Sequence, residues 1–600
     1  MNRRQHMIVH FLRYGAVLGS VVCCWGYQRA VERLPELSEF AVEHYFERAQ
    51  VYGDYLTCIF LYLSPACILG AIACATMAPV RRLVSRGFIL WMRLPSVVFW
   101  GVVPAIFFAA NAWTAYEVIG AVPRVFDAFN YWFQAKNFSL GQLYASVPAV
   151  PEFFQFPFVI MRDGRWYGSV YPGFPIILAV GVAWGVEWLV NPVLGGISLS
   201  VLYFLTRRVL GQSAARAVAV LGLTSPFWRM MSSNFMSHAA GTLWVALALW
   251  AVWIWVEKGR NVRAWVPLLF GCTLGWLYMT RPQAGAVALF FPGIWAAVRI
   301  RWCGWRNLML MFVPCVCAIM LLGMYNQSLT GDFRTNPRYF VDPGRRLGFG
   351  DDIGEPLASG RRSGHSWQKG VHNVAVLLNL WNAELVGWGA WGPVGWQTLL
   401  SLTFLIVRRR SSWTWVSLAT LGLNFLLYLF YFTPSPHFGP RYLAETIPFS
   451  LLVSIAGLHD IYRLAVKWVG SEASRTGMVA LTCFLIGVSI TCTVPFHTVH
   501  YGVLPASMSR HAILEPMEPA VILIPKSLYT MNIWTWNSPN QDGNIYLPMG
   551  KPEAINRLRA AFPDRTFYVV KASDGPPENL KLIPMEGFNR VEGIVKGHNE

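Results

Sequence analysis

The chain is dominated by long apolar runs that alternate with short polar loops. A helix needs about 20 apolar residues to cross the hydrocarbon of a membrane, and about thirteen runs reach or approach this length. They lie at 8–27, 55–79, 94–116, 193–206, 214–231, 235–256, 264–281, 283–299, 307–324, 391–407, 412–432, 446–462 and 476–496. The pattern therefore predicts an all-α polytopic membrane protein with about 13 transmembrane helices.

Arginine and lysine residues gather in the short loops at one end of these runs. The clusters include Arg81, Arg82 and Arg86 after the second run, Arg207 and Arg208 after the fourth, and Lys258, Arg260 and Arg263 after the sixth. Positively charged loops stay in the cytoplasm, which predicts a cytoplasmic N-terminus. The loops 117–171 and 325–390 and the tail after 497 then lie on the opposite side. Counting the apolar run 172–190 as a span would reverse these sides downstream, so we expect it, like 372–388, to form a juxtamembrane helix.

The tail has a different pattern from the rest of the chain. Short apolar runs at 520–525, 544–549 and 566–572 predict buried strands, and the segment between the last two predicts a helix. We therefore expect three parts. They are an N-terminal extension of two spans (1–93), a transmembrane domain (94–496) and a small extracytoplasmic α/β domain (497–600).

Composition and charge exclude several classes of function. Only 13% of residues are charged, about half of what a soluble domain carries. The net charge of +18 lies mostly in the loops between apolar runs, which argues against a nucleic-acid partner. The 11 cysteines lie in or beside apolar runs, so neither a disulfide framework nor a zinc site is expected. Phosphate-binding glycine loops and metalloprotease motifs are missing from the sequence.

The segment from Pro123 to Gly173 carries the strongest candidate for chemistry. Its polar residues recur at helical spacing and its aromatic residues fill the other side, which predicts an amphipathic helix in a membrane interface. The polar set is Asp127, Asn130, Tyr131 and Gln134, and the aromatic set is Phe126, Phe129, Trp132 and Phe133. Asp127 is a candidate general base. The alternative is a polar-face residue or a charge that favours the N-terminus of the helix.

Four further places offer groups that bind phosphate or headgroups, and each has a structural alternative. Arg281 ends a span and either holds a lipid phosphate or only reaches the interface. Arg345 and Arg346 belong to a basic loop that binds phosphate or is solvated. The loop 436–445 carries His437, Arg441 and Tyr442. There a headgroup contact competes with a helical pair of Arg441 and Glu445. Tyr171-Pro172-Gly173 makes a rigid turn into the next helix.

Taken together, these motifs resemble the GT-C superfamily of membrane glycosyltransferases. Within it they are similar to the bacterial protein-mannosyltransferase-like and aminoarabinose-transferase-like enzymes. The resemblance covers about 94–463 and rests on FDAFNYWFQAKNFSLGQLY, YGSVYPGFPIILA, LYMTRPQAG, YNQSLTGDFRTNPRYFVDPGRRLGFG and HFGPRYLAETIP. The sequence has Asp127-Ala128 where many relatives have Asp-Glu, and Tyr171-Pro172-Gly173 lacks the second proline of the usual pattern. Because the glutamate after Asp127 is missing, we predict no metal. We also predict no other cofactor.

The resemblance implies an inverting enzyme that transfers a hexosyl or pentosyl group from a polyprenyl phosphate to an envelope acceptor. It implies an active site on the periplasmic face of a bacterial inner membrane. Asp127 is then the catalytic carboxylate of the outer loop 117–171, and Arg281 and Arg441 are candidates for the lipid phosphate. The same reading assigns Tyr131, Tyr171, Arg345, Arg346, His437 and Tyr442 to substrate binding. The alternatives are a transporter or flippase of lipid-linked glycans, and a catalytically inactive scaffold.

Overall fold

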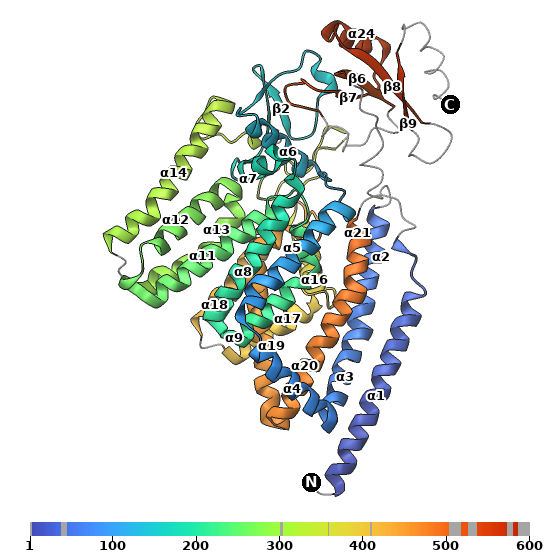
Figure 1. The fold of residues 1–600 in the computed structure, drawn as a ribbon, viewed down its shortest axis with the longest axis vertical. Helices are drawn as coiled ribbons and strands as arrows, with labels where there is room; N and C mark the ends of the chain where they lie inside the picture. Colours follow the sequence, from blue (N-terminus) through green and yellow to red (C-terminus); the bar gives the residue numbers. More distant parts are fainter. Residues whose placement is uncertain are drawn as a thin grey trace.

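A computed structural model describes residues 3–37, 45–300, 304–341, 343–357, 359–408, 411–502, 518–525, 537–572 and 580–585. Within these residues, nine helical stretches are long and apolar enough to cross a membrane, and three shorter apolar helices accompany them. Two small sheets, one in the loop after residue 139 and one near the C-terminus, lie at one end of the helices, at the top of Figure 1, and we call this end the sheet end. The predicted class, a polytopic helical membrane protein with a small C-terminal sheet, is confirmed.

The helices follow the apolar runs of the sequence. The first are α1 (Arg3–Val31), α2 (Tyr45–Cys58), α3 (Ser64–Thr76), α4 (Ala78–Arg93) and α5 (Val103–Trp113). The middle of the chain forms α6 (Phe126–Ser139), α7 (Gly173–Ala183), α8 (Val190–Leu210), α9 (Gln212–Leu223), α10 (Pro226–Met231), α11 (His238–Lys258), α12 (Trp265–Thr280), α13 (Pro282–Ile300) and α14 (Trp305–Thr330). The last are α15 (Arg338–Val341), α16 (Trp367–Glu384), α17 (Trp396–Arg408), α18 (Ser412–Leu429), α19 (Ile447–Val469), α20 (Ser471–Val488) and α21 (Val494–Tyr501).

Several long helices contain a wide π-turn just before a proline. The turns are η3 (Ile59–Leu63), η4 (Val98–Val102) and η10 (Ser489–Thr493), and Pro65, Pro104 and Pro495 follow them. Proline lacks an N–H and its ring collides with a carbonyl of the preceding turn. One extra residue in that turn moves the carbonyl away. The helices therefore continue through these prolines, as the apolar runs predict.

One expected span is divided. The run 214–231 forms α9 and α10, which are separated at Thr224 and Ser225. Ser225 caps α10 because its Oγ accepts a hydrogen bond from the N–H of Trp228 at 3.2 Å, and Pro226 occupies the first helical position. The expected juxtamembrane run 172–190 forms α7, which has 11 residues. At 1.5 Å per residue this helix is about 17 Å long, too short to cross the hydrocarbon.

The strands form three small sheets. β1 (Ala145–Ser146), β3 (Arg165–Gly168) and β2 (Val159–Arg162) make an antiparallel sheet in the loop after α6. β4 (Ala390–Trp391) and β5 (Val394–Gly395) make a hairpin. The C-terminal sheet has the order β7-β6-β8-β9, formed by β6 (Ala520–Ile524), β7 (Ile545–Pro548), β8 (Thr566–Ala572) and β9 (Leu580–Pro584), with α24 (Pro552–Ala561) between β7 and β8. β6 is buried along its whole length, as expected for a strand with parallel neighbours on both sides. The rest of the expected tail domain lies outside the described residues.

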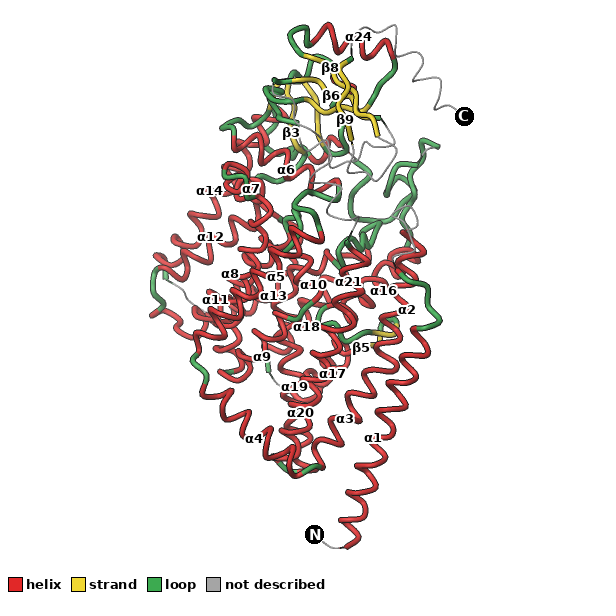
Figure 2. Tube along the Cα trace, turned by 45° about the vertical axis from the view of Figure 1, so that its right-hand side comes forward, coloured by secondary structure: helices red, strands yellow, loops and turns green. Residues whose placement is uncertain are grey.

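The C-terminal sheet shares its hydrophobic core with α6. Phe129 and Phe133 of α6 and Trp166 of β3 belong to one buried cluster with residues of β6, β7, β8 and α24. Another side of α6, with Tyr131 and Trp132, packs against α7 and α11. The aromatic residues of α6 were predicted to lie in a membrane interface. For Phe129, Trp132 and Phe133 this is wrong, because these side chains are buried against the sheet or against α7 and α11, while Phe126 is 41% exposed. Figure 2 shows α6 between the C-terminal sheet and the membrane helices.

Candidate active site

Asp127 lies in the first turn of α6, at the sheet end of the membrane helices (Figure 1). Val125 has an extended backbone, and the helix begins at Phe126. A carboxylate in the first turn is favoured by the positive end of the helix dipole. The Asp127 side chain is 25% exposed, and its Oδ2 accepts a hydrogen bond from Nη1 of Arg441 at 3.2 Å. The structure thus brings two of the predicted site residues into contact across 314 positions of sequence.

Two further arginines act on the Asp127 carboxylate. They are Arg338 of α15 and Arg345, and both come from the loop between α14 and α16. Burial alone raises the pKa of Asp127, but the positive charges of Arg441, Arg338 and Arg345 together bring it below its ordinary value of 3.8. Asp127 is therefore ionised at neutral pH, the form that a general base requires.

This lowered pKa predicts the acid side of a pH profile. A carboxyl whose pKa is depressed by folding keeps its charge, and the stability from its ion pairs, until the pH falls through the depressed value. If Asp127 acts as a base, we expect transfer rates with no acid inflection from this group between pH 5 and 8. Loss is expected only below about pH 4. Initial rates in buffers of constant ionic strength measure this. An inflection near pH 6 that disappears in an Asp127 variant would contradict the prediction.

Arg441 begins the 3₁₀ turn η9 (Arg441–Thr446), which leads into α19. Its Nη2 donates to Ser435 Oγ, and its guanidinium lies 5.0 Å from the ring centre of Tyr442. Tyr442 stacks on Tyr428 with a centroid distance of 4.8 Å and meets Tyr431 edge-on at 5.4 Å. Tyr428, Tyr431 and Tyr442 therefore form an aromatic cluster beside the Arg441 guanidinium, whose Nη1 contacts Asp127 of α6.

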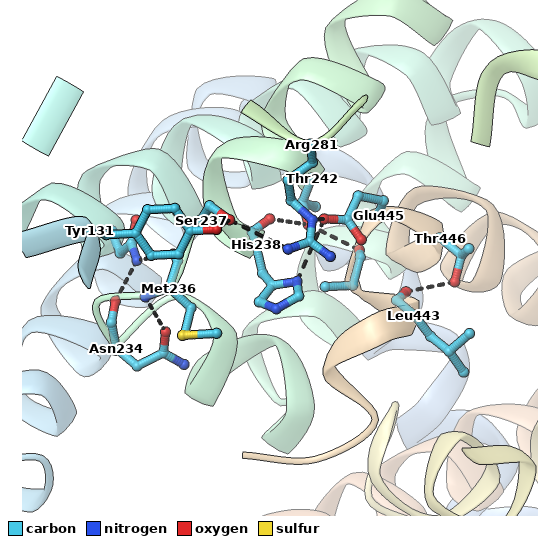
Figure 3. Close-up of polar contacts among 12 residues, drawn as sticks. Tyr131, Asn234, Met236, Ser237, His238, Thr242, Arg281, Leu443, Glu445 and Thr446 are labelled. Carbon is cyan, nitrogen blue, oxygen red and sulfur yellow. Dashed lines mark hydrogen bonds and ion pairs between the residues drawn. The ribbon is translucent and has the colours of Figure 1, made fainter. Parts of the chain in front are cut away.

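A second, buried network of polar side chains surrounds Glu445 (Figure 3). Glu445 is fully buried, and its Oε1 forms an ion pair with Nε of Arg281 and lies 3.5 Å from Nδ1 of His238. Arg281 Nη1 donates to Ser237 Oγ at 3.4 Å, and Ser237 Oγ donates to the hydroxyl of Tyr131 at 3.0 Å. The network connects the turn η9, the junction between α12 and α13, the start of α11, and α6. The predicted helical pair of Arg441 and Glu445 is wrong, because Arg441 pairs with Asp127 of α6 and Glu445 pairs with Arg281 between α12 and α13.

The remaining predicted residues differ in their partners and their burial. Arg345 pairs with Glu355 and stacks on Phe158 at 4.6 Å, and Arg346 pairs with Asp352. Tyr171 precedes α7, and burial raises its pKa to about 12, so its hydroxyl is protonated at neutral pH. The ring of His437 is exposed, in the loop before Arg441.

Two residues near the site were not among the predicted site residues. Arg338 lies in the same basic loop as Arg345 and Arg346, and Glu445 was predicted only as a possible partner of Arg441. A carboxylate between apolar residues at the start of a span costs free energy unless it is paired. This made Glu445 a detectable signal in the sequence, although its partner was not evident.

A comparison with protein families places part of the chain in a known class. Residues 177–324 match the family described as dolichyl-phosphate-mannose-protein mannosyltransferase. The matching segment runs from α7 to α14, about a quarter of the chain, and includes Arg281 but neither Asp127 nor Arg441. The match confirms the predicted resemblance to the GT-C superfamily of membrane glycosyltransferases.

Among solved structures, the chain is similar to ArnT from Cupriavidus metallidurans bound to undecaprenyl phosphate. The identity is 12%, the similarity covers 79% of this chain and 92% of that chain, and the TM-score is 0.49. For the apo state of the same protein the identity is 13%, the similarity covers 82% of this chain and 94% of that chain, and the TM-score is 0.48. For the apo oligosaccharyltransferase of Archaeoglobus fulgidus the identity is 12%, the similarity covers 80% of this chain and 70% of that chain, and the TM-score is 0.43. The search of curated proteins gives no match.

Proposed function

We propose that this protein is an inverting glycosyltransferase that transfers a sugar from a polyprenyl phosphate to an acceptor of the cell envelope. The observation that carries the proposal is the ionised Asp127 carboxylate in contact with Arg441 and near two further arginines. The Asp127 carboxylate is a single candidate base held beside a cluster of positively charged side chains. Inversion at the anomeric carbon needs these two features, a base for the acceptor and a stabiliser for the departing phosphate.

In the proposed reaction, Asp127 takes the proton from the acceptor hydroxyl or amine. The acceptor atom forms a bond to the anomeric carbon while the bond from that carbon to the phosphate oxygen breaks. The electron pair leaves with the phosphate, whose growing negative charge is stabilised by Arg338, Arg345 or Arg441. The transition state has oxocarbenium character, as in glycoside hydrolysis. The proposed reaction needs only the donor and the acceptor, and no further reactant.

The family match and the charge distribution support the donor and the side of the membrane. The matched family is described by a polyprenyl-phosphate sugar donor. The basic clusters predict that α4 faces the cytoplasm, and α4 lies at the end opposite the sheets (Figure 1). We therefore assign the active site and the C-terminal sheet to the periplasmic face of a bacterial inner membrane, with a cytoplasmic N-terminus.

Lipid mass spectrometry on cells tests this proposal. Deletion of the gene is expected to cause accumulation of one polyprenyl-phosphate sugar and loss of the same sugar from an envelope glycan, lipid or protein. The wild-type gene supplied in trans restores both. A deletion that changes neither would contradict the proposal. Accumulation of a lipid-linked glycan on the cytoplasmic face alone would indicate a transporter instead.

A further inference from the structure

A second buried carboxylate, Glu384, lies at the end of α16 and is fully buried. Its Oε1 accepts a hydrogen bond from the hydroxyl of Tyr501 at 3.1 Å, and its Oε2 lies 3.2 Å from Nε2 of His497. Both partners belong to α21. A fully buried carboxylate is retained at a cost in desolvation and is strongly held by its partners. Glu384 has no place in the proposed chemistry, so its charge requires another explanation.

The carboxylate of Glu384 lies directly against the turn that carries Arg441. Gly439 has a φ of +100°, and a Cβ at this position would collide with Glu384 Oε2. The N–H of Arg441 donates to the carbonyl of Gly439 at 2.7 Å. Phe438 is buried, and its ring centre lies 6.3 Å from that of Tyr501. The position of Arg441 therefore depends on where Glu384 holds this turn.

The N-terminal helices complete the surroundings of Glu384. Tyr52 of α2 stacks on His500 with a centroid distance of 4.3 Å and meets Tyr501 edge-on at 5.9 Å. The segment after Glu384 is fixed from the same side, because Ser64 of α3 donates to the carbonyl of Trp388 at 3.2 Å. Both figures place α2 beside α21. A continuous series of contacts thus runs from α2 through α21 and Glu384 to Gly439.

We propose that Glu384 is a positioning residue that places Arg441 against Asp127, and that α2 and α21 hold Glu384 for this purpose. The proposal rests on the proposed function, since Arg441 is taken there to face the donor phosphate. It gives the N-terminal helices a role, which is to support the active site from behind.

Hydrogen exchange of the full-length protein in lipid nanodiscs tests the proposal without relying on activity. Glu384→Gln keeps the shape of the side chain and removes its charge. Weaker hydrogen bonds to His497 and Tyr501 are expected to loosen the side chain that packs against Gly439, and so to speed exchange of the peptide that covers 434–446 by about tenfold. Asp460→Asn is the matched control, because Asp460 is equally buried and pairs with Arg408 of α17 at 2.7 Å, away from this turn. Unchanged exchange in the Glu384 variant, or the same increase in the control, would overturn the proposal.

Binding of undecaprenyl phosphate connects the turn to the site. Glu384→Gln is expected to weaken this binding by about tenfold, and Arg441→Lys to weaken it as well. If Glu384 acts through Arg441, the double variant binds no more weakly than Arg441→Lys alone. Additive losses would overturn the proposal. Wild-type protein that does not bind undecaprenyl phosphate would contradict the proposed function, while hydrogen exchange would still decide the role of Glu384.

A milder variant keeps the test decisive if Glu384→Gln does not fold. Tyr501→Phe removes one hydrogen-bond donor to Glu384 and leaves the ring in place. Its expected effect is an increase of about threefold in the exchange of 434–446. Exchange at the wild-type rate in a folded Tyr501→Phe protein would overturn the proposal.

Discussion

Asp127→Asn is expected to lower the rate of sugar transfer by about 10²–10⁴-fold, the usual contribution of a general base. The amide has nearly the shape of the carboxylate, but it has no charge and accepts no proton at neutral pH. Its oxygen still accepts a hydrogen bond from Arg441, so the fold is expected to remain intact. Initial rates with the donor identified by lipid analysis, on protein of confirmed thermal stability, measure the effect.

Asp163→Asn is the matched control for this experiment. Asp163 lies in the same loop, its side chain is 77% exposed, and its partner is the neighbouring Arg162. Its φ of +50° is one that asparagine also tolerates. We expect a rate within about twofold of the wild type, because surface substitutions of this kind have small effects. Equal rates for wild type and Asp127→Asn would remove Asp127 from the mechanism.

Glu445→Ala is expected to cause the largest loss of stability, about 3–5 kcal/mol. The substitution leaves Arg281 and His238 without the carboxylate that they surround, and Glu445 itself is completely buried. An unpaired charge at such a position must be desolvated without compensation. The unfolding free energy in mixed micelles with increasing denaturing detergent measures the change.

A double substitution separates the stability of this network from its chemistry. Glu445→Leu combined with Arg281→Met replaces the ion pair by apolar side chains of similar volume. Such replacements are often neutral or stabilising, so we expect the double variant to recover most of the lost stability. If Arg281 also binds the donor phosphate, transfer stays low in the double variant. A double variant as unstable as Glu445→Ala would show that the network is needed for its shape and not for its charge balance.

The sequence predicts the long helices of this protein well, because a helix that crosses a membrane needs a continuous apolar run. The helix α6 was also predictable, since polar residues recur at helical spacing from Asp127 onward, between two spans. The break between α9 and α10 was missed, although Ser225-Pro226 is a local signal for the start of a helix. Apolar residues continue through this break, and they concealed it.

The partners of the charged residues were not predictable in the same way. Arg441 has Glu445 one helical turn away in sequence, and local spacing favoured that pair. The turn η9 separates them, and each side chain reaches another helix, Arg441 toward Asp127 and Glu445 toward Arg281. The aromatic side of α6 gave a similar error, since lipid and a distant sheet are equally apolar neighbours. Periodicity predicts that a face is buried but does not identify what covers it.

The core shared by α6 and the C-terminal sheet can form only late in the synthesis of this protein. Roughly 400 residues separate α6 from the strands that cover Phe129 and Phe133. A ribosome adds about 5–20 residues per second, so these strands are synthesised on the order of 20–80 s after α6, and its aromatic side stays without them for that time. In the proposed topology, the last strands must cross the membrane before they can cover this side of α6. If Asp127 acts as proposed, a nascent or prematurely terminated chain inserts its spans before its site is complete, and transfer begins only with the finished protein.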